Sequence, residues 1–499
     1  MPEISQHELD EKARVSQVPQ AETTASTTNS KSAEGSFDDV DRDGDTSDSV
    51  LDAQLVRRID LRLLPILTLL YLLSFLDRTN IGNARFARQD LNLSAPAYNT
   101  SLALYFVAYV IFEVPSNIIL KRFDPQLWLP TLTLVWGIVT VCQGLVTNQA
   151  GLFGIRFLLG ATEAGLFPGV IYLFSIYYLR RERRARVAIF FGGAALAGAF
   201  GGILAFAIGK MEGIGGRRGW QWIFILEGLL TIIISLLAYA IVPTWSYKAK
   251  FLTEPQRNRL LSRLDSDTDP AHIEPFQWVH VKQAFTDRLV WGYAFLFHGY
   301  AFALYSLSLF MPTIITELGF QTWQAQLLTV PPNALAALSI TLTVWLSIRR
   351  DRRAVFIIGA AVVAIVAGAQ YVGVHLAAAG VYTGNALLLS WPGENVAGQT
   401  KRAVAVAMQI TFGDIGAIAG VLIYRPNFAQ HQYRKPHIIA IGYLLFAIAV
   451  AAYLRFELAS ENRRKDALAN SQLGTQKPSD SIQDRQRLGD HHIIYRYVY

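Results

Sequence analysis

The sequence of 499 residues contains one cysteine, Cys142, and little charge. A single thiol cannot form a disulfide within the chain, which excludes a disulfide-stabilised scaffold. Only 17% of the residues are charged, whereas soluble domains carry about 25%. With 52% hydrophobic residues, this balance also excludes a soluble enzyme and a disordered regulator. The class that remains is a membrane protein with several spans.

The charge that is present is unevenly distributed. Residues 1–50 contain 12 acidic and 4 basic residues, so the rest of the chain, whose total is +7, carries +15. This first segment lacks the basic, apolar and cleavage-site pattern of a signal peptide. It offers almost nothing to bury, so we predict a disordered tail over residues 1–54. The bases elsewhere lie between hydrophobic runs, which argues against nucleic acid as a partner.

Hydrophobic runs long enough to cross a bilayer, which takes about 20 residues per helix, recur along the chain. Ten runs lie near residues 63–82, 98–120, 127–147, 150–178, 187–209, 222–242, 290–316, 326–348, 403–424 and 437–454. Residues 354–393 contain no Asp, Glu, Lys or Arg, and 40 residues at about 1.5 Å each cover two spans. We place a turn between these two near residues 368–374. The sequence therefore predicts an all-α membrane protein with twelve transmembrane helices in two six-helix bundles.

The basic residues favour one orientation of these spans. With both termini in the cytosol, the short cytosolic loops hold 13 bases and the outward loops hold 8. Bases concentrate on the cytosolic side of membrane proteins. The outward bases are Arg85, Arg88, Lys210, Arg217, Arg218, Arg425, Arg434 and Lys435. The predicted segments after the tail are a bundle over 55–242, a cytoplasmic linker over 243–289, a bundle over 290–456 and a cytosolic tail over 457–499.

The two halves show traces of a parallel repeat. Residues 184–188 (RARVA), which open the fifth span, correspond to residues 401–405 (KRAVA), which open the eleventh. The interval from Arg122 to Arg186 is 64 residues, but that from Arg350 to Arg402 is 52. We therefore expect a short ninth helix. The bases at these openings determine topology and can also hold the inner gate closed; they are Arg183, Arg184, Arg186, Lys401 and Arg402.

Several charged residues lie inside the predicted spans, where each costs about 2.5–3.5 kcal/mol at the helix centre and needs a reason. The first half contains Asp77, Arg78, Glu113, Arg156, Glu163 and Glu227, and the second half contains His298, His375 and Asp414.

Arg156 and Glu163 are seven residues apart and share one helix face, separated by about 10.5 Å. That separation is too long for a direct contact, so the two residues suit separate tasks along one cavity wall. Arginine provides a planar fork for a carboxylate, and a buried glutamate can exchange a proton near neutral pH. Together they indicate proton-coupled uptake of an acid. The alternative is that each is a structural ion paired with another helix.

The other charges leave more than one interpretation open. Asp77 and Arg78 lie near the outer end of the first span, where they either line the site or extend to the membrane surface. Glu113 follows Tyr109 at helical spacing and either lines the cavity or bonds to another helix. The residues expected to be structural are Glu227, His298 and His375.

Five motifs resemble one transporter family. They are residues 76–84 (LDRTNIGNA), 113–117 (EVPSN), 156–169 (RFLLGATEAGLFPG), 218–228 (RGWQWIFILEG) and 395–403 (NVAGQTKRA). They are similar to the fungal anion:cation symporter branch of the major facilitator superfamily, which includes allantoate and nicotinic acid permeases. The resemblance covers about residues 55–465. Asp414 departs from it, because the family usually has asparagine after the glycine at 413.

The resemblance implies two bundles around a central site that moves an organic anion with protons by alternating access. It implies that Arg78 and Arg156 contact substrate carboxylates and that Glu163 couples to protons. We add Asn80 and Tyr109 to the expected substrate site. Asp77 and Glu113 join Glu163 as expected proton-coupling residues. Family precedent also implies a monomer.

The leading hypothesis is a fungal plasma-membrane symporter that takes up a small carboxylate, such as nicotinate or allantoate, with protons. One alternative is an exporter of an acidic secondary metabolite, and another is a transporter-derived nutrient sensor. No His-rich box, Ser–His–Asp set or metal-ligand spacing is present in the loops. We therefore expect no enzymatic activity, no cofactor and no metal.

Overall fold

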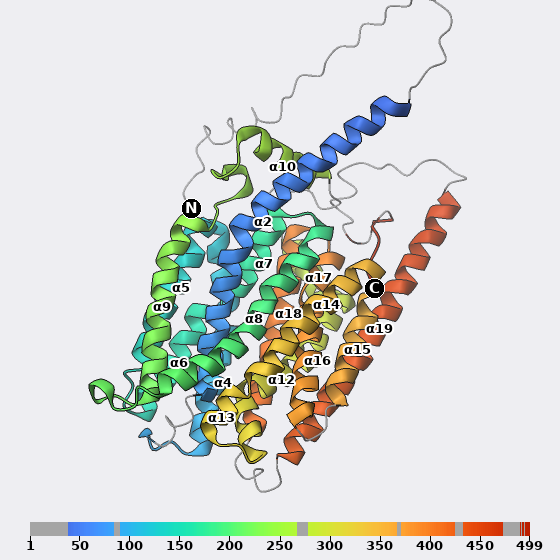
Figure 1. Ribbon diagram of the computed structural model, residues 1–499. Coiled ribbons are helices and arrows are strands. Elements are labelled where there is room, and N and C mark those ends of the chain that lie inside the picture. Colours follow the sequence, from blue (N-terminus) through green and yellow to red (C-terminus); the bar gives the residue numbers. More distant parts are fainter. Residues whose placement is uncertain are drawn as a thin grey trace, which may run out of the picture. The chain divides into compact units, whose positions relative to one another are not determined.

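The computed structural model describes residues 38–83, 90–266, 278–366, 371–424, 433–472, 490, 492–493 and 495–499 (Figure 1). The chain divides into two compact units, residues 1–53 and 54–499. The account below concerns the second unit. Its described residues are helices and connecting loops, without a β-strand, and the predicted all-α fold is confirmed.

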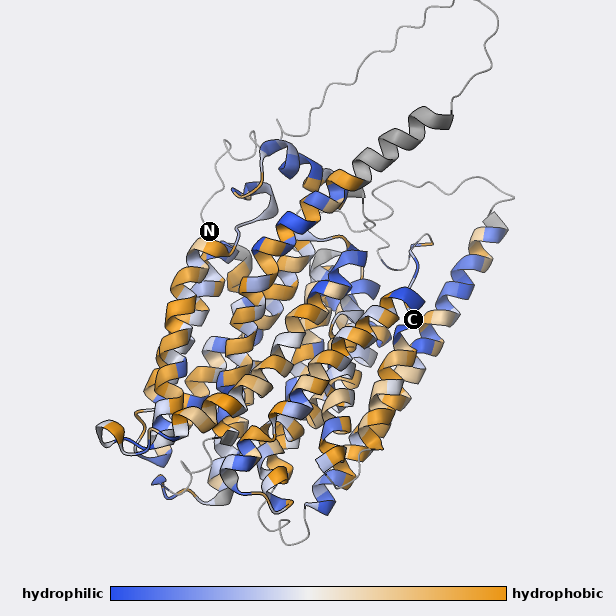
Figure 2. Cartoon of the chain, in the orientation of Figure 1, coloured by the Kyte–Doolittle hydropathy of each residue, from blue (hydrophilic) through white to orange (hydrophobic). Residues whose placement is uncertain are grey.

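Eleven helices of the described residues are long and apolar enough to cross a membrane. They are the span 50–82 within α2 (Asp38–Asn83), α4 (Ala95–Arg122), α5 (Pro125–Gln143), α6 with α7 (Gln149–Glu163, Leu166–Tyr177), α8 (Arg180–Gly209), α9 (Gly219–Ile241), α12 (Arg288–Glu317), α13 with α14 (Thr322–Leu327, Val330–Arg350), α16 with α17 (Tyr371–Leu389, Trp391–Asn395), α18 (Gln399–Ile423) and α19 (Arg434–Gln472). Each overlaps a predicted span. At the ninth position, α15 (Arg353–Ile365) has 13 residues. Apolar residues predominate along the middle of the helices in Figure 2.

The connections contain shorter elements. The loop between α8 and α9 includes the 3-10 turn η1 (Ile214–Gly216), and the central connection includes η2 (Ser246–Lys248), α10 (Glu254–Ser266) and α11 (Trp278–Thr286). We call the end of the bundle at which α10 and α11 lie the linker end; α10 is at the top of Figure 1. Residues 54–242 are the first half and residues 288–472 the second half.

The fourth membrane helix of each half, which is the fourth and the tenth of the chain, is interrupted. In the fourth, α6 ends at Glu163 and α7 begins at Leu166, with Pro168 in its first turn. In the tenth, α16 ends at Leu389 and α17 begins at Trp391, with Pro392 next. Proline lacks an amide donor, so it fits the first turn of a new helix better than the interior of a continuous one.

The two halves pack closely at the end opposite the linker. Gly198 and Gly202 of α8 face the start of α14 and the residues before it, and a Cβ atom at Gly198 would overlap the side chain of Asn333. At the same end, Asn99 of α4 donates a hydrogen bond to the carbonyl oxygen of Tyr424 over 3.1 Å. Small residues allow such close helix crossings. This end is therefore closed by close packing against the small residues of α8.

The described structure differs from the prediction at both tails. Helix α2 begins at Asp38, so residues 38–54 are helical where disorder was predicted; a helix extends readily from an established span because each added residue adds a hydrogen bond. Helix α19 continues to Gln472, well beyond the predicted end at residue 456, because the added residues include many good helix formers. The predicted disorder of residues 1–37 falls outside the described residues.

Other predictions are affected in part. Residues 371–374, assigned to the turn between the ninth and tenth spans, are the first turn of α16. The rest of that turn, residues 368–370, and the bases Arg85, Arg88 and Arg425 lie outside the described residues. The second bundle begins with α12 at Arg288, two residues before the predicted boundary.

Candidate functional site

Arg78 of α2 and Glu163 of α6 form a buried ion pair. Arg78 Nη2 lies 2.7 Å from Glu163 Oε1, and the two side chains are 5% and 0% exposed. Ser74 also donates a hydrogen bond to Glu163 Oε1. Across the boundary between the halves, Arg78 Nη1 donates to the hydroxyl of Tyr305 on α12 over 2.5 Å. The pair joins a predicted substrate-binding residue to a predicted proton-coupling residue.

Three tyrosine rings surround the guanidinium of Arg78. Its Cζ lies 5.1 Å from the ring centroid of Tyr105, 5.4 Å from that of Tyr109 and 5.6 Å from that of Tyr305. Aromatic faces stabilise a cation within about 6 Å. Arg78 Nε is buried and has no hydrogen-bond partner. The guanidinium therefore retains one donor for a further acceptor.

Arg156 of α6 is 1% exposed, and its Cζ lies 5.6 Å from the Tyr105 ring centroid. Its Nε and Nη1 are buried without a hydrogen-bond partner. Unpaired buried donors of a charged group are costly. This geometry does not match a fully paired structural ion and leaves Arg156 able to bind an anion. Glu163, in contrast, is paired with another helix, as the alternative interpretation describes.

Asp77 and Asn80 point into the first half. Trp136 Nε1 donates to Asp77 Oδ2 over 2.9 Å, with Thr140 Oγ1 3.4 Å from the same oxygen. Asn80 donates to Glu227 of α9. Asp77 and Arg78 are 1% and 4% exposed, so the interpretation that they extend to the membrane surface is wrong. Packing of α2 against α5, α6 and α12 encloses them instead.

Glu113 of α4 contacts the second half. Its Oε2 accepts a hydrogen bond from Thr411 Oγ1 of α18 over 3.0 Å, and its Oε1 is buried without a partner. The sequence left two alternatives for Glu113, and this contact is the bond to another helix. Asp414, one turn further along α18, is 3% exposed, and its Oδ2 also lacks a partner. Buried carboxyl groups from both halves therefore lie along the contact between α4 and α18.

A cavity of about 60 Å³ lies between α4, α7 and α18. Its lining includes Asn117, Pro168, Ser175 and Val406. Arg156 and Glu163 are not part of this lining, and both are enclosed by protein. That the two side chains line one hollow stays a prediction; in this conformation Tyr105 lies over the Arg156 guanidinium.

At the linker end, Arg184 of α8 connects the two halves. Its Nη1 lies 2.7 Å from Asp351 Oδ1, and its Nε lies 2.7 Å from Glu394 Oε2. Glu394 also pairs with Arg353, which donates to Ser390. Arg184 thus has the acidic partners that a gate residue requires.

The other predicted gate residues have different partners. Arg186 forms two hydrogen bonds to Asp60, of 2.7 and 3.0 Å, within the first half. Arg183 donates to the Tyr178 carbonyl oxygen over 3.2 Å. Lys401 and Arg402 begin α18 in the second half. Lys401 Nζ lies 2.7 Å from Asp287 Oδ2, and Arg402 donates to the carbonyl oxygen of Val396.

Two residues of this arrangement were not predicted. Tyr305 lies in an aromatic run of α12, and nothing in the sequence separates it from its neighbours. Glu394 is the first charged residue after the uncharged stretch 354–393 and follows Pro392. Its isolation was a usable signal for a site at the end of the tenth span.

Comparisons with known proteins agree with this architecture. The sequence matches the Major Facilitator Superfamily over residues 67–421. The chain belongs to this superfamily of transporters. A crystal structure of a bacterial homologue of the human lysosomal transporter Spinster has a TM-score of 0.59 and 16% identity, and the match covers 79% of this chain and 96% of that one.

Two fungal relatives match over most of their length. An uncharacterized transporter of Schizosaccharomyces pombe is 33% identical, covering 88% of this chain and 90% of the relative. The high-affinity nicotinic acid transporter of Saccharomyces cerevisiae is 30% identical, covering 92% of this chain and 88% of the relative. The chain is a multi-pass membrane protein and a secondary transporter.

Proposed function

We propose that this protein is a proton-coupled symporter of a small organic anion and that it works by alternating access. The observation that carries the proposal is the buried Arg156, whose Nε and Nη1 have no partner, beside the Arg78–Glu163 ion pair. A buried cation with free donors favours an anionic ligand. Its position near the boundary between the halves is where a transported substrate must bind.

The Arg78–Glu163 ion pair gives a physical reason why anion binding would be coupled to proton binding. While Glu163 is ionised, it occupies Arg78 and neutralises it. Protonation of Glu163 removes that charge, so Arg78 can accept a substrate carboxylate in its place. Binding of one anion and one proton then leaves the net charge of the site unchanged, which avoids an uncompensated buried charge. Loss of the proton restores the pair and expels the anion.

The surroundings of the two arginines favour a planar acid. Tyr105 is close to both guanidinium groups, and Tyr109 and Tyr305 flank Arg78. Aromatic faces stack on flat rings and bury them. Nicotinate satisfies this description, and one relative is a nicotinic acid transporter. Allantoate and other small carboxylates offer the same charge.

We assign the linker end to the cytosol and the protein to the plasma membrane as a monomer. The larger number of bases in the loops at that end supports this orientation. Asp77 and Glu113 stay candidates for the proton path, and Asn80 is a candidate for positioning α2 through Glu227.

Uptake of labelled carboxylates by yeast cells that lack their own acid permeases tests the proposal. We expect accumulation of nicotinate or a related acid in acidic medium and its loss when a protonophore removes the gradient. A label that leaves preloaded cells faster, with no uptake, would identify an exporter instead. A growth response to the acid without any flux would identify a sensor.

The Glu163→Gln variant tests the coupling residue. Glutamine resembles the protonated acid and cannot ionise, so we expect substrate binding and exchange to persist while accumulation becomes independent of the pH gradient. Glu212→Gln is the matched control. Glu212 lies outside the membrane helices, where hydrogen bonds from the Gly219 amide and Arg218 lower its pKa. A Glu163→Gln transporter that still accumulates substrate only down a proton gradient would contradict this role.

A further inference from the structure

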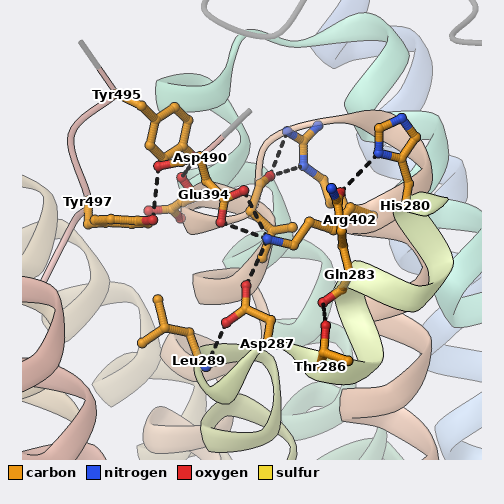
Figure 3. Close-up of polar contacts among 12 residues, drawn as sticks. His280, Gln283, Thr286, Asp287, Leu289, Glu394, Arg402, Asp490, Tyr495 and Tyr497 are labelled. Atoms are coloured by element: carbon orange, nitrogen blue, oxygen red, sulfur yellow. Dashed lines mark hydrogen bonds and ion pairs between the residues drawn. The ribbon is translucent and has the colours of Figure 1, made fainter. Parts of the chain in front are cut away.

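A segment beyond α19 packs against the linker end of the bundle. We call Asp490, His492 and residues 495–499 the docked segment. Asp490, Tyr495 and Tyr497 are 2%, 4% and 4% exposed. Figure 3 shows Tyr495 and Tyr497 beside Asp490, close to Asp287 and Glu394. The predicted cytosolic tail thus includes a segment with a buried position.

The docked segment bonds to the broken tenth helix through its backbone. The Val498 amide donates to Asn395 Oδ1 over 2.8 Å, and Asn395 Nδ2 donates back to the Val498 carbonyl oxygen over 2.9 Å. Trp391 Nε1 donates to the same oxygen over 2.8 Å. Asn462 of α19 forms a second reciprocal pair with the backbone of Tyr497. The side chains of Asn395, Trp391 and Asn462 are therefore placed to form hydrogen bonds with a peptide backbone.

Buried charges fix the segment as well. Lys401 Nζ lies 2.9 Å from both carboxylate oxygens of Asp490. Lys465 donates to the carbonyl oxygens of Asp490 and Tyr495 over 2.5 and 3.1 Å. Lys401 is 4% exposed and Lys465 is 3% exposed. The segment therefore covers both ammonium groups and supplies acceptors for each of them.

The same segment reaches the first half. Arg180, the first residue of α8, donates through Nη2 to the Arg496 carbonyl oxygen over 3.1 Å. Its Cζ lies 4.3 Å from the ring centroid of Tyr495. The Tyr495 hydroxyl donates to the Glu394 carbonyl oxygen over 2.8 Å. Tyr495 therefore joins α8 to α17, next to the Arg184–Glu394 ion pair that connects the same two helices.

We propose that the docked segment is an autoinhibitory strap that holds the linker end closed. Opening at this end requires α8 to move away from α17, and that movement breaks the contacts of Tyr495 with Arg180 or with Glu394. Release of the segment then increases the population of the conformation open at the linker end. The inference uses the transporter fold and is independent of the substrate proposed above.

Thiol accessibility tests the proposal in the full-length protein. A Cys142→Ser background removes the native thiol, and Val406→Cys places a reporter in the cavity between α4, α7 and α18. Val406 is 6% exposed, and the cavity is also lined by Arg402, near the linker-end start of α18. The rate of alkylation of purified protein by a hydrophilic maleimide then reports opening of the linker end. Deleting residues 490–499 should raise this rate about tenfold or more, because several buried hydrogen bonds are lost together.

A single hydroxyl gives the sharper test. Tyr495→Phe keeps the ring, removes the hydroxyl that donates to the Glu394 carbonyl oxygen, and should raise the alkylation rate about threefold to tenfold. Tyr499→Phe is the matched control, since this side chain is 41% exposed, and should leave the rate unchanged. Arg184→Ala, which breaks the neighbouring ion pairs, is the positive control.

An unchanged rate in Tyr495→Phe, with a raised rate in Arg184→Ala, would overturn the proposal even if the deletion variant fails to fold. An equal rise in Tyr499→Phe would overturn it too, because the effect would not come from the bond to Glu394. Alkylation needs no substrate, so this result is independent of whether an organic anion is transported.

Discussion

The fourth and tenth membrane helices hold equivalent positions in the two halves but carry different chemistry. The fourth, α6 with α7, contains Arg156 and Glu163, buried in its interior. The tenth, α16 with α17, has no Asp, Glu, Lys or Arg until Glu394, in the short piece after its break. In the proposed mechanism, the first half therefore supplies the ionisable groups for binding, and the second half supplies a carboxylate that pairs with Arg184 at the linker end.

The position of the break agrees with this division. In the fourth helix the break directly follows Glu163, so the end of α6 is part of the candidate site. In the tenth helix it follows Leu389 and leaves a turn that holds Glu394 toward Arg184 and Arg353. The same interruption thus adjoins the proposed binding site in one half and an ion pair between the halves in the other.

Removing the charge of Arg78 should have the largest effect. Arg78→Met leaves Glu163 buried without its partner, and we expect a loss of about 3–5 kcal/mol in the free energy of unfolding. Thermal unfolding of the purified protein in detergent measures the change. Adding Glu163→Gln to this variant should recover most of the loss, because the uncompensated charge is then absent. No recovery in the double variant would show that the two residues are not energetically coupled.

Substituting one glycine beside each helix interruption compares how tightly the two interruptions are packed. A Cβ atom at Gly165, in the fourth helix, would overlap Ser116 Oγ, whereas a Cβ atom at Gly393, in the tenth, meets nothing within 4 Å. Gly165→Ala should therefore destabilise the fold by about 1–3 kcal/mol, as overpacking does. Gly393→Ala should leave the unfolding temperature near that of the parent protein. Equal effects would mean that the two breaks are packed alike.

Arg156→Lys should act on binding more than on folding. Lysine keeps the positive charge but loses the planar fork, so we expect substrate affinity to fall about tenfold. Concentration-dependent uptake measures the change, with the unfolding temperature as the control for folding. Arg217→Lys, in the loop between α8 and α9, is the matched control substitution. Unchanged uptake kinetics would exclude Arg156 from substrate contact.

The sequence was sufficient to predict the membrane helices, because each needs a long apolar run and the runs are separated by charged loops. It also marked Arg78, Arg156 and Glu163 as candidate site residues, because charge inside an apolar run is conspicuous and costly, and their role stays a prediction. The breaks were less clear. The end of α6 at Glu163 was not predicted, and the close approach of Ser116 to Gly165 beside it leaves no pattern in the sequence.

The partners of these residues could not be predicted. Arg156 and Glu163 share a helix, and the sequence placed them in one site, but Glu163 pairs with Arg78 from α2. Tyr305 joins them only because α12 packs there, and contacts between helices far apart in the sequence leave no local pattern. The docked segment was missed for the same reason, since its partners lie on α8, α17, α18 and α19.

The two ends of the boundary between the halves should respond differently to ionic strength. At the linker end, the Arg184–Asp351 pair includes an aspartate whose side chain is 69% exposed, so dissolved ions screen it within a Debye length of about 8 Å at physiological salt. At the other end, Gly198 and Gly202 pack against Asn333 and the residues before it, contacts that contain no charge to screen. A rise in salt should therefore weaken the exposed Arg184–Asp351 pair, while the buried Arg184–Glu394 pair and the uncharged contacts at the other end should respond little.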